Sequence, residues 1–294
     1  MDFQQDLSAK TAEIEKIIGK FLPSETGPQK TVLEAMNYGM AAGGKRLRPM
    51  LMQETYRLFG GDNAVIEPFM AAIEMIHNYS LIHDDLPAMD NDEYRRGRKT
   101  THAVYGETMG ILAGDALLNF AYETAASAFS LELSPRTAQA LQLLATKAGI
   151  YGMVGGQTVD IESEHKKADL ETVQFIHRNK TGALIEAAMG IGAILAGATE
   201  AEQAAVAQIA ADVGLAFQIQ DDILDVTSTT EALGKPVGSD DKNEKSTYVS
   251  LQGLDKAKED VAFLSYRALH SLRGLPGENP FLENLITALI TRGK

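Results

Sequence analysis

The segment 199–226, TEAEQAAVAQIAADVGLAFQIQDDILDV, decides the fold class. Thr199 and Glu202 have the spacing of a capping box, in which each side chain accepts a hydrogen bond from the other residue's backbone N–H. Apolar residues then recur at helical spacing as far as about Val226. The pattern predicts one long helix whose last turns carry Asp221, Asp222 and Asp225.

Other helix boundaries are marked by residues that favour helix ends. Ser, Asn and Asp accept hydrogen bonds from free backbone N–H groups, and proline suits the first helical turn. Gly43-Gly44 ends the segment 31–41, and Pro49 is expected to start the next helix. The predicted N-caps are Ser134 and Asn279, each directly before a proline, together with Asp169 and Asp255.

The chain shows no sustained period-two alternation, so a sheet is not expected. It also shows no internal repeat, no low-complexity tract and no linker between two halves. We therefore predict a single all-α domain over residues 1–294, with about ten or more helices. Two irregular segments, 87–101 and 227–246, begin near an aspartate cluster and are expected to be functional loops.

Composition limits the possible partners. The chain has 294 residues, no cysteine and a formal net charge of −13. This charge argues against nucleic acid as a partner, because phosphate backbones attract basic surfaces. It leaves small anionic ligands possible, because a local group of cations can reverse the field inside one cleft.

The compartment is expected to be the cytoplasm. The absence of cysteine excludes disulfides and fits a reducing environment. The first residues, MDFQQDLSAKTAEIEK, carry charges where a signal peptide needs an apolar run. The most apolar segment, 183–198, contains Glu186 and is shorter than the ~20 residues of a membrane span. We expect a tightly packed core helix there, and no stable membrane insertion.

The aspartates at the end of the long segment are candidate metal ligands. Positions 218, 221, 222 and 225 share one helical face. Like charges four residues apart, as at Asp221 and Asp225, destabilise a helix unless a cation lies between them. Mg²⁺ prefers such oxygens and commonly combines one or two carboxylates with substrate phosphates. A solvated acidic patch is the alternative, but the flanking apolar residues leave little surface for solvent.

A second acidic run, Asp84-Asp85-Leu-Pro-Ala-Met-Asp90, follows a predicted helix over 73–83. Pro87 should end or kink that helix, so Asp90 can return towards Asp84 only through a bent backbone. A calcium-binding EF-hand loop starting at Asp90 would need glycine at its sixth position, where Arg95 stands. Two acidic clusters, each closing an apolar helix, therefore predict a site for Mg²⁺ and a diphosphate.

Basic residues occur in short groups near these clusters. The stretch Gly43-Gly44-Lys45-Arg46-Leu47-Arg48 places cations at a helix N-terminus, which favours anions. Arg95-Arg96 can bind phosphate oxygens with paired hydrogen bonds. Each basic group alone is more often a solvated charge, and a histidine such as His77 is more often a core residue. The other candidates are Lys180 and Thr181 within a helical run, and Lys235 and Lys245 after the second cluster.

Six motifs occur in order along the chain: GGKRLRP at 43–49, SLIHDDLPAMD at 80–90, RRG at 95–97, GGQTVD at 155–160, KTG at 180–182 and FQIQDDILD at 217–225. The set resembles the short-chain trans-prenyl diphosphate synthases over nearly the whole chain. The four-residue spacer in the first cluster is similar to that of the bacterial farnesyl diphosphate synthases.

The resemblance implies an all-α bundle around a deep central cavity, usually homodimeric, with Mg²⁺ (about three ions with substrate bound). It implies that two aspartate sets bind Mg²⁺ and an allylic diphosphate: Asp84, Asp85 and Asp90, and Asp221, Asp222 and Asp225. It implies allylic diphosphate contacts from Arg95, Lys180, Thr181, Gln218 and Lys235. It implies isopentenyl diphosphate contacts from Lys45, Arg48, His77 and Arg96. The role of Lys245 stays open, because Glu244 precedes it where relatives often have glycine.

The implied reaction joins dimethylallyl or geranyl diphosphate head-to-tail to isopentenyl diphosphate. Mg²⁺ and basic residues stabilise the departing pyrophosphate, the isopentenyl double bond attacks the allylic cation, and a proton is lost. Tyr79, beside Ser80, lies five residues before Asp84, about 7.5 Å along the helix axis. In the family a bulky residue there limits chain length, so we expect farnesyl diphosphate. Core packing alone is the other possible role of Tyr79.

Three other functions can be separated from this one. A geranylgeranyl diphosphate synthase would differ in product length. A terpene cyclase would carry an Asn/Ser/Glu metal motif in place of DDILD at 221–225, and would have no use for a second diphosphate site at Lys45 and Arg48. An acidic helical scaffold would bind Mg²⁺ weakly and independently of phosphate.

Overall fold

A computed structural model of the chain describes residues 2–227 and 246–291. In these ranges nearly all regular structure is helical, which confirms the all-α prediction. The exception is a short antiparallel hairpin of β1 (Tyr94–Arg95) and β2 (Arg98–Lys99). Within the same ranges, no helix combines the length and the apolar character needed to cross a bilayer. The chain divides into two compact units, and its organisation as a single domain stays a prediction.

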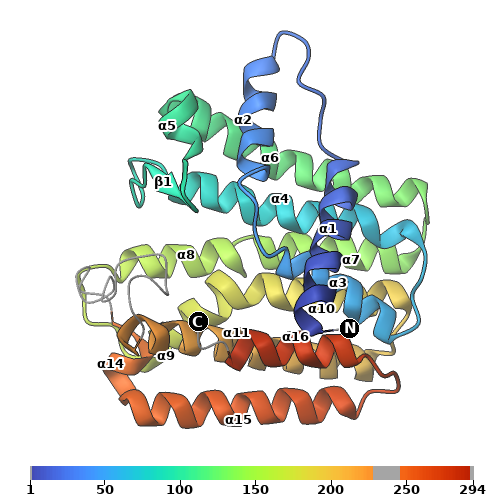
Figure 1. Cartoon of the computed structure of the whole chain (residues 1–294), viewed down its shortest axis with the longest axis vertical. Helices are drawn as coiled ribbons and strands as arrows, with labels where there is room; N and C mark the ends of the chain where they lie inside the picture. Colours follow the sequence, from blue (N-terminus) through green and yellow to red (C-terminus); the bar gives the residue numbers. More distant parts are fainter. Residues whose placement is uncertain (1, 228–245, 292–294) are drawn as a thin grey trace. The chain divides into compact units, whose positions relative to one another are not determined.

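The first unit comprises residues 1–53 and 63–141. Its central helix is α4 (Glu67–Asp84), which is buried along most of its length and has Pro68 in its first turn. It contacts α1 (Phe3–Gly19), α2 (Lys30–Met40) and α6 (Glu107–Ala126), and α6 runs alongside it in Figure 1. The other elements here are α3 (Leu47–Leu58), which continues into the second unit, η1 (Ala64–Ile66), α5 (Thr101–Tyr105), η2 (Ser127–Ser130) and the start of α7 (Pro135–Ala148).

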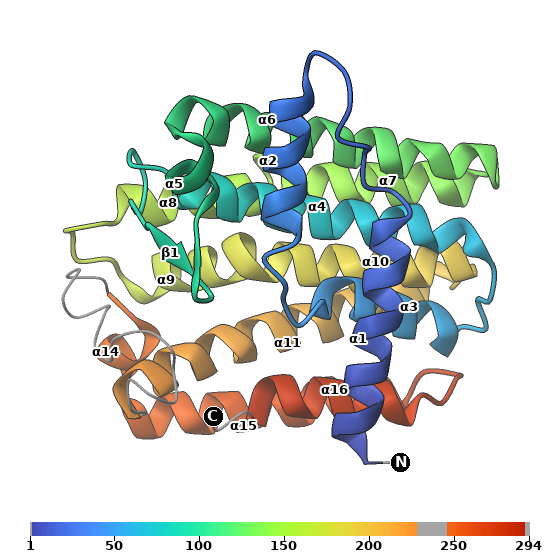
Figure 2. The ribbon, with the colours of Figure 1, turned by 45° about the horizontal axis from the view of Figure 1, so that its top comes forward.

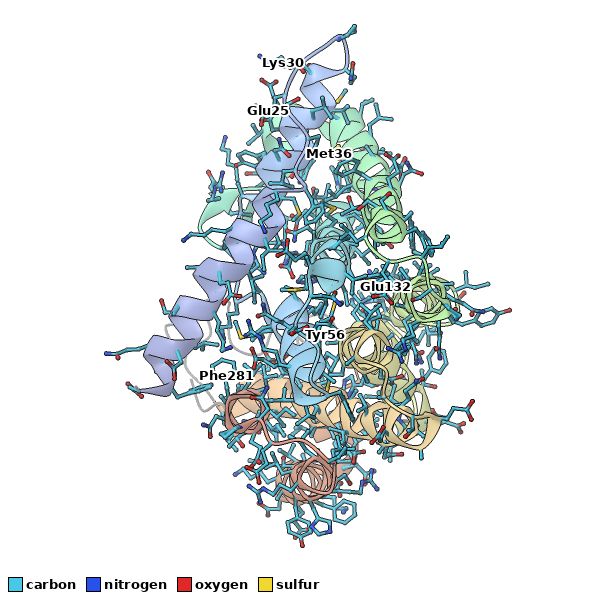
Figure 3. The ribbon with its side chains drawn as sticks, turned by 90° about the vertical axis from the view of Figure 1, so that its right-hand side faces the viewer. Glu25, Lys30, Met36, Tyr56, Glu132 and Phe281 are labelled. Atoms are coloured by element: carbon cyan, nitrogen blue, oxygen red, sulfur yellow. The ribbon has the colours of Figure 1, made fainter. Side chains whose placement is uncertain are left out.

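Two glycines let neighbouring helices approach the end of α4 that carries the first aspartate cluster. A Cβ atom at Gly39 on α2 would lie 2.7 Å from Cδ1 of Ile82. A Cβ atom at Gly114 on α6 would lie 2.1 Å from Nε2 of His83. In Figure 3, Lys30 marks the start of α2 and Met36 a buried position further along it. The C-terminal end of α4 is therefore enclosed by packed helices.

The second unit comprises residues 54–62 and 142–294. Its core helix α10 (Ala183–Ala196) is almost wholly buried, as predicted for the apolar segment 183–198. The long helix α11 (Glu200–Thr227) contacts α10 and α15 (Leu254–Arg273), and Figure 2 shows α11 and α15 together. The remaining elements are α8 (Met153–Glu162), α9 (Leu170–Ile176), the π-helical turn η3 (His177–Gly182), α14 (Tyr248–Gln252) and α16 (Pro280–Thr291).

Most predicted helix starts are confirmed by hydrogen bonds. Glu202 Oε2 accepts from the Thr199 amide at 2.6 Å, and Thr199 Oγ1 accepts from the Glu202 amide at 3.3 Å. The side chains of Ser134, Asp169 and Asn279 each accept from the amide three residues on.

Two predicted starts are wrong. Asp255 is not an N-cap: α15 begins at Leu254 directly after Gly253, whose φ of 84° turns the chain between α14 and α15. Asp255 lies instead in the first helical turn, where its charge still favours the helix dipole. The helix assigned to Pro49 begins two residues earlier, at Leu47.

Candidate functional site

The backbone folds back on itself directly after α4. The amide of Asp90 donates to the carbonyl of Asp84 at 2.9 Å, and the amide of Asp92 donates to that of Asp85 at 3.2 Å. Asn91 has a φ of 55°, in the left-handed region that asparagine tolerates better than most residues. The bent backbone predicted from Pro87 is present, and it places Asp90 beside the end of the helix.

Asp85 is the buried aspartate of this cluster, and an arginine binds it. Asp85 is buried, and its Oδ1 accepts from Nε of Arg95 at 2.7 Å. Burial raises the pKa of Asp85, and the Arg95 guanidinium opposes that shift. Asp84 is half-buried and Asp90 is exposed. Asp84 and Asp90 are therefore the more accessible carboxylates of the cluster.

Arg95 and Arg96 lie on the β1–β2 hairpin. Its two turn residues, Arg96 and Gly97, have φ values of 52° and 75°, as a two-residue type I′ turn requires. The Arg96 guanidinium donates to the carbonyl of Gly43. The RRG and GGKRLRP motifs, far apart in the sequence, are therefore bonded to each other in the first unit.

Arg48 and His77 are buried basic groups in this region. Nε of Arg48 is buried and has no hydrogen-bond partner among the described residues. Burial lowers the pKa of His77 well below 6.5, and the charges of Arg48 and Arg96 lower it further. His77 is therefore a neutral hydrogen-bonding group at neutral pH. Lys45, in the GGKRLRP motif, is exposed. An anion would relieve the repulsion among these cations.

Tyr79 and Ser80 lie on α4 as the spacing predicts. Tyr79 is buried and meets the ring of His83 edge-on, with 5.8 Å between ring centroids. Burial, with smaller effects of Tyr122 and Asp84, raises the pKa of Tyr79 to about 12. The Ser80 hydroxyl donates within its own helix, to the carbonyl of His77 at 2.9 Å. A buried ring fits both a chain-length role and core packing, so the former stays a prediction.

The second aspartate cluster ends α11. Nε2 of Gln218 donates to Oδ2 of Asp221 at 3.3 Å, so these residues share a helical face as predicted. Oδ2 of Asp222 accepts from the amide of Tyr248 at 2.7 Å, which caps the start of α14. Nε2 of His177 lies 3.6 Å from the same oxygen. The Tyr248 amide therefore holds Asp222, and Asp225 is buried at the end of the cluster.

Lys180 and Thr181 lie in the π-helical turn η3, which interrupts the helical run as predicted. Nζ of Lys180 donates to Oδ2 of Asp160, on α8, at 2.6 Å. A Cβ atom at Gly156 would lie 2.1 Å from the backbone nitrogen of Lys180. On the other side of η3, a Cβ atom at Gly214 would lie 2.9 Å from Cα of Gly182. Close glycine contacts with α8 and α11 therefore fix the position of Lys180.

Arg46, Asp160 and His177 belong to these clusters, although no motif alone assigned them a role. Asp160 lies one helical turn after Gly156, on the α8 face that packs against η3, and His177 lies three residues before Lys180. These spacings are the signals that could have identified them. Arg46 gives no such signal, because its neighbours Lys45 and Arg48 are also cationic.

Several predictions about the site stay predictions. Lys235 and Lys245 lie outside the described residues. The Asp84 cluster belongs to the first unit and the Asp221 cluster to the second. Among the described residues, no three histidine or acidic side chains converge on one metal position. The carboxylate oxygens of each cluster nevertheless fit Mg²⁺, which takes much of its coordination from water and phosphate.

Known proteins resemble this chain over nearly its whole length. Residues 29–269 match the family described as polyprenyl synthetase. A farnesyl diphosphate synthase from Geobacillus stearothermophilus is 44% identical, over 93% of this chain and 92% of that protein. A geranylgeranyl diphosphate synthase from Cyanophora paradoxa is 43% identical, over 87% and 89% respectively.

One solved structure is similar to this chain in both fold and sequence. It is the geranyltransferase from Helicobacter pylori, described as complexed with magnesium and isoprenyl diphosphate. Its TM-score is 0.83 at 31% identity, covering 99% of this chain and 97% of that one. The resemblance predicted from six motifs is confirmed: the chain belongs to the polyprenyl synthetase family.

Proposed function

We propose that this polyprenyl synthetase family member is a Mg²⁺-dependent prenyltransferase. It condenses dimethylallyl and then geranyl diphosphate with isopentenyl diphosphate and releases farnesyl diphosphate. The observation that carries the proposal is that each aspartate cluster closes a helix beside cationic groups. Arg95 binds Asp85 after α4, and η3, which carries Lys180, packs against α11.

In this proposal Asp84, Asp85, Asp90, Asp221, Asp222 and Asp225 form the two Mg²⁺-binding clusters. Mg²⁺ held by these residues would neutralise charge that develops on the departing pyrophosphate. The accessible carboxylates of Asp84 and Asp90 bind a cation directly, while Asp85 orients Arg95 towards the allylic diphosphate.

The basic and polar residues divide between the two substrates. Lys180, Thr181, Gln218 and Lys235 bind the allylic diphosphate with Arg95, and Lys245 stays a candidate substrate ligand whose partner is open. Lys45, Arg48 and Arg96 bind isopentenyl diphosphate, and neutral His77 contributes a hydrogen bond without adding charge. No residue forms a covalent intermediate, because the basic side chains, together with Mg²⁺ that the carboxylates would hold, stabilise the anionic leaving group.

Tyr79 sets the product at fifteen carbons by blocking the path of the growing chain along α4. The working form is a cytoplasmic homodimer. Both statements rest on the family resemblance, together with the position of Tyr79 five residues before Asp84.

The direct test is to incubate the chain with Mg²⁺, dimethylallyl diphosphate and labelled isopentenyl diphosphate, and to separate the products by chromatography. A fifteen-carbon alcohol after phosphatase treatment is expected. A twenty-carbon product would assign the alternative, geranylgeranyl diphosphate synthase, and a cyclic hydrocarbon would assign a terpene cyclase. No turnover, with Mg²⁺ binding that ignores added diphosphate, would indicate an acidic scaffold.

Single carboxylate changes sharpen this test. Asp84→Asn and Asp221→Asn should each lower kcat by about a hundredfold, as expected for losing an electrostatic stabiliser of the transition state. Asp255→Asn makes the same chemical change in the exposed first turn of α15 and serves as the matched control. Equal activity in all three variants would remove the metal-binding assignment.

A further inference from the structure

Three carbonyl groups, at the C-terminal end of α2 and in the segment that follows it, each accept a hydrogen bond from an arginine side chain. Carbonyls at the C-terminal end of a helix lack partners within the helix. Arg46 donates to Met40 O at 2.8 Å, Arg98 donates to Ala41 O at 2.5 Å, and Arg96 donates to Gly43 O.

Arg46 is the buried member of this group and joins three elements. Its Nε donates to Glu15 on α1 at 2.7 Å, and its Nη1 donates to Glu74 on α4 at 2.7 Å. The Arg46 side chain is 1% exposed and that of Glu74 is 4% exposed. Burial alone would lower the pKa of Arg46, but the two carboxylates more than offset it. Each of the three guanidinium nitrogens donates to a protein partner and the side chain is buried, so Arg46 does not bind substrate itself.

The backbone around Arg46 needs such support. Gly43, Gly44 and Arg46 all have positive φ, with 48° at Arg46, where a side chain is strained. A strained conformation persists only where surrounding contacts over-determine it. Lys45 directly precedes Arg46 and is exposed. Arg48 lies two residues after Arg46, and its buried Nε has no hydrogen-bond partner among the described residues.

We propose that Arg46, bound by Glu15 and Glu74, is a positioning residue for the diphosphate of isopentenyl diphosphate. It fixes the loop 43–48 so that Lys45 and Arg48 point their charges at one anion. The inference rests on the proposed function for the substrate's identity. The chemistry it requires is only a diphosphate group.

The first test keeps the charge and changes the geometry. In Arg46→Lys the positive charge remains, but an ammonium cannot hold three acceptors in the planar arrangement of a guanidinium. KM for isopentenyl diphosphate should rise about tenfold, while KM for the allylic substrate and kcat stay within about twofold. Arg273→Lys, which alters an exposed pair with Glu283, is the matched control.

The second test uses the direction in which KM for isopentenyl diphosphate changes when Glu15 is removed. Glu15 is half-exposed, so its removal should leave the fold intact even if Arg46→Lys fails to fold. If the local field alone mattered, Glu15→Ala would remove a negative charge and lower KM for the anionic substrate. Positioning predicts the opposite, a rise of about fivefold for Glu15→Ala. Glu15→Gln keeps an acceptor for Arg46 and should not show that rise.

A matched control is Glu34→Ala, which removes a carboxylate from an exposed pair on α2. A lowered or unchanged KM in Glu15→Ala would overturn the proposal. So would a parallel loss of kcat, of both KM values and of thermal stability, because that pattern marks general destabilisation.

Calorimetric titration with inorganic pyrophosphate in Mg²⁺-free buffer separates this proposal from the proposed function. Weaker pyrophosphate binding in Glu15→Ala than in Glu34→Ala supports the positioning role even if the wild type lacks prenyl transfer. Equal binding in the two variants overturns the positioning role even if the wild type is an active synthase.

Discussion

Gly156→Ala should displace the backbone around Lys180 and destabilise the protein without changing any charge. The added Cβ would lie 2.1 Å from the backbone nitrogen of Lys180 and 2.7 Å from the carbonyl carbon of Asn179. Real Cβ contacts essentially never fall below 3.0 Å, so either α8 or η3 must move by about 1 Å. Both obstructing atoms belong to the backbone, and no side-chain rotation can relieve the overlap.

The magnitude follows from two opposing effects. Overpacking of this kind costs about 3 kcal/mol, and replacing glycine by alanine inside a helix returns about 1 kcal/mol. The net loss of about 2 kcal/mol should lower the melting temperature by about 5 °C. A displacement of about 1 Å at a catalytic group can lower kcat about a hundredfold.

Gly19→Ala is the matched control, because a Cβ atom there would meet nothing within 4 Å. It lies at the end of α1 and should leave stability unchanged or raise it by up to about 1 kcal/mol. Differential scanning fluorimetry and steady-state kinetics on both variants give the comparison. Equal melting temperatures and equal kcat values would refute the close packing of α8 against η3.

The remaining predictions concern the residue that limits chain length, an ion pair and the dependence of stability on pH. Tyr79→Ala should lengthen the product on chromatography and cost about 3 kcal/mol of stability; an unchanged product would leave Tyr79 with packing alone. Asp160→Asn should reduce kcat/KM for the allylic substrate about tenfold, because the 2.6 Å charge-assisted bond that orients Lys180 is weakened; a gain in affinity would mean that only the local field matters. Burial lowers the pKa of His177 to about 4, and the charge of Asp160 opposes this shift. Between pH 6.5 and 4 the unfolded chain therefore binds more protons than the folded chain, and stability falls as the pH falls. Urea midpoints should therefore indicate a loss of about 2 kcal/mol between pH 7 and pH 5, and His177→Gln should abolish that part of the loss.

The helix boundaries were predictable wherever a side chain acts on its own local backbone. Asp169 bonds an amide three residues away, so its role is visible in a short stretch of sequence. The prediction that Asp255 is an N-cap was wrong because Gly253, with its positive φ, lets α14 and α15 adjoin without a separate capping residue.

Contacts between distant residues were not predictable in the same way. Arg46 points inward to carboxylates 31 and 28 residues away, and nothing in the local pattern separates it from exposed Lys45. Asp222 binds the amide of Tyr248, a group that every residue except proline possesses, so the sequence carries no mark of it. The residues that make up the acidic and basic clusters could be predicted from the sequence. Which group each of them contacts depends on tertiary packing and could not.

The hairpin at Arg96 has a consequence for protein engineering. Asparagine or glycine would adopt its left-handed backbone more easily, by about 1 kcal/mol. A redesign that ranks residues by conformational ease would therefore discard Arg96 and gain thermal tolerance. It would lose the guanidinium that ties the hairpin to the Gly43 carbonyl and that we propose as a ligand of isopentenyl diphosphate.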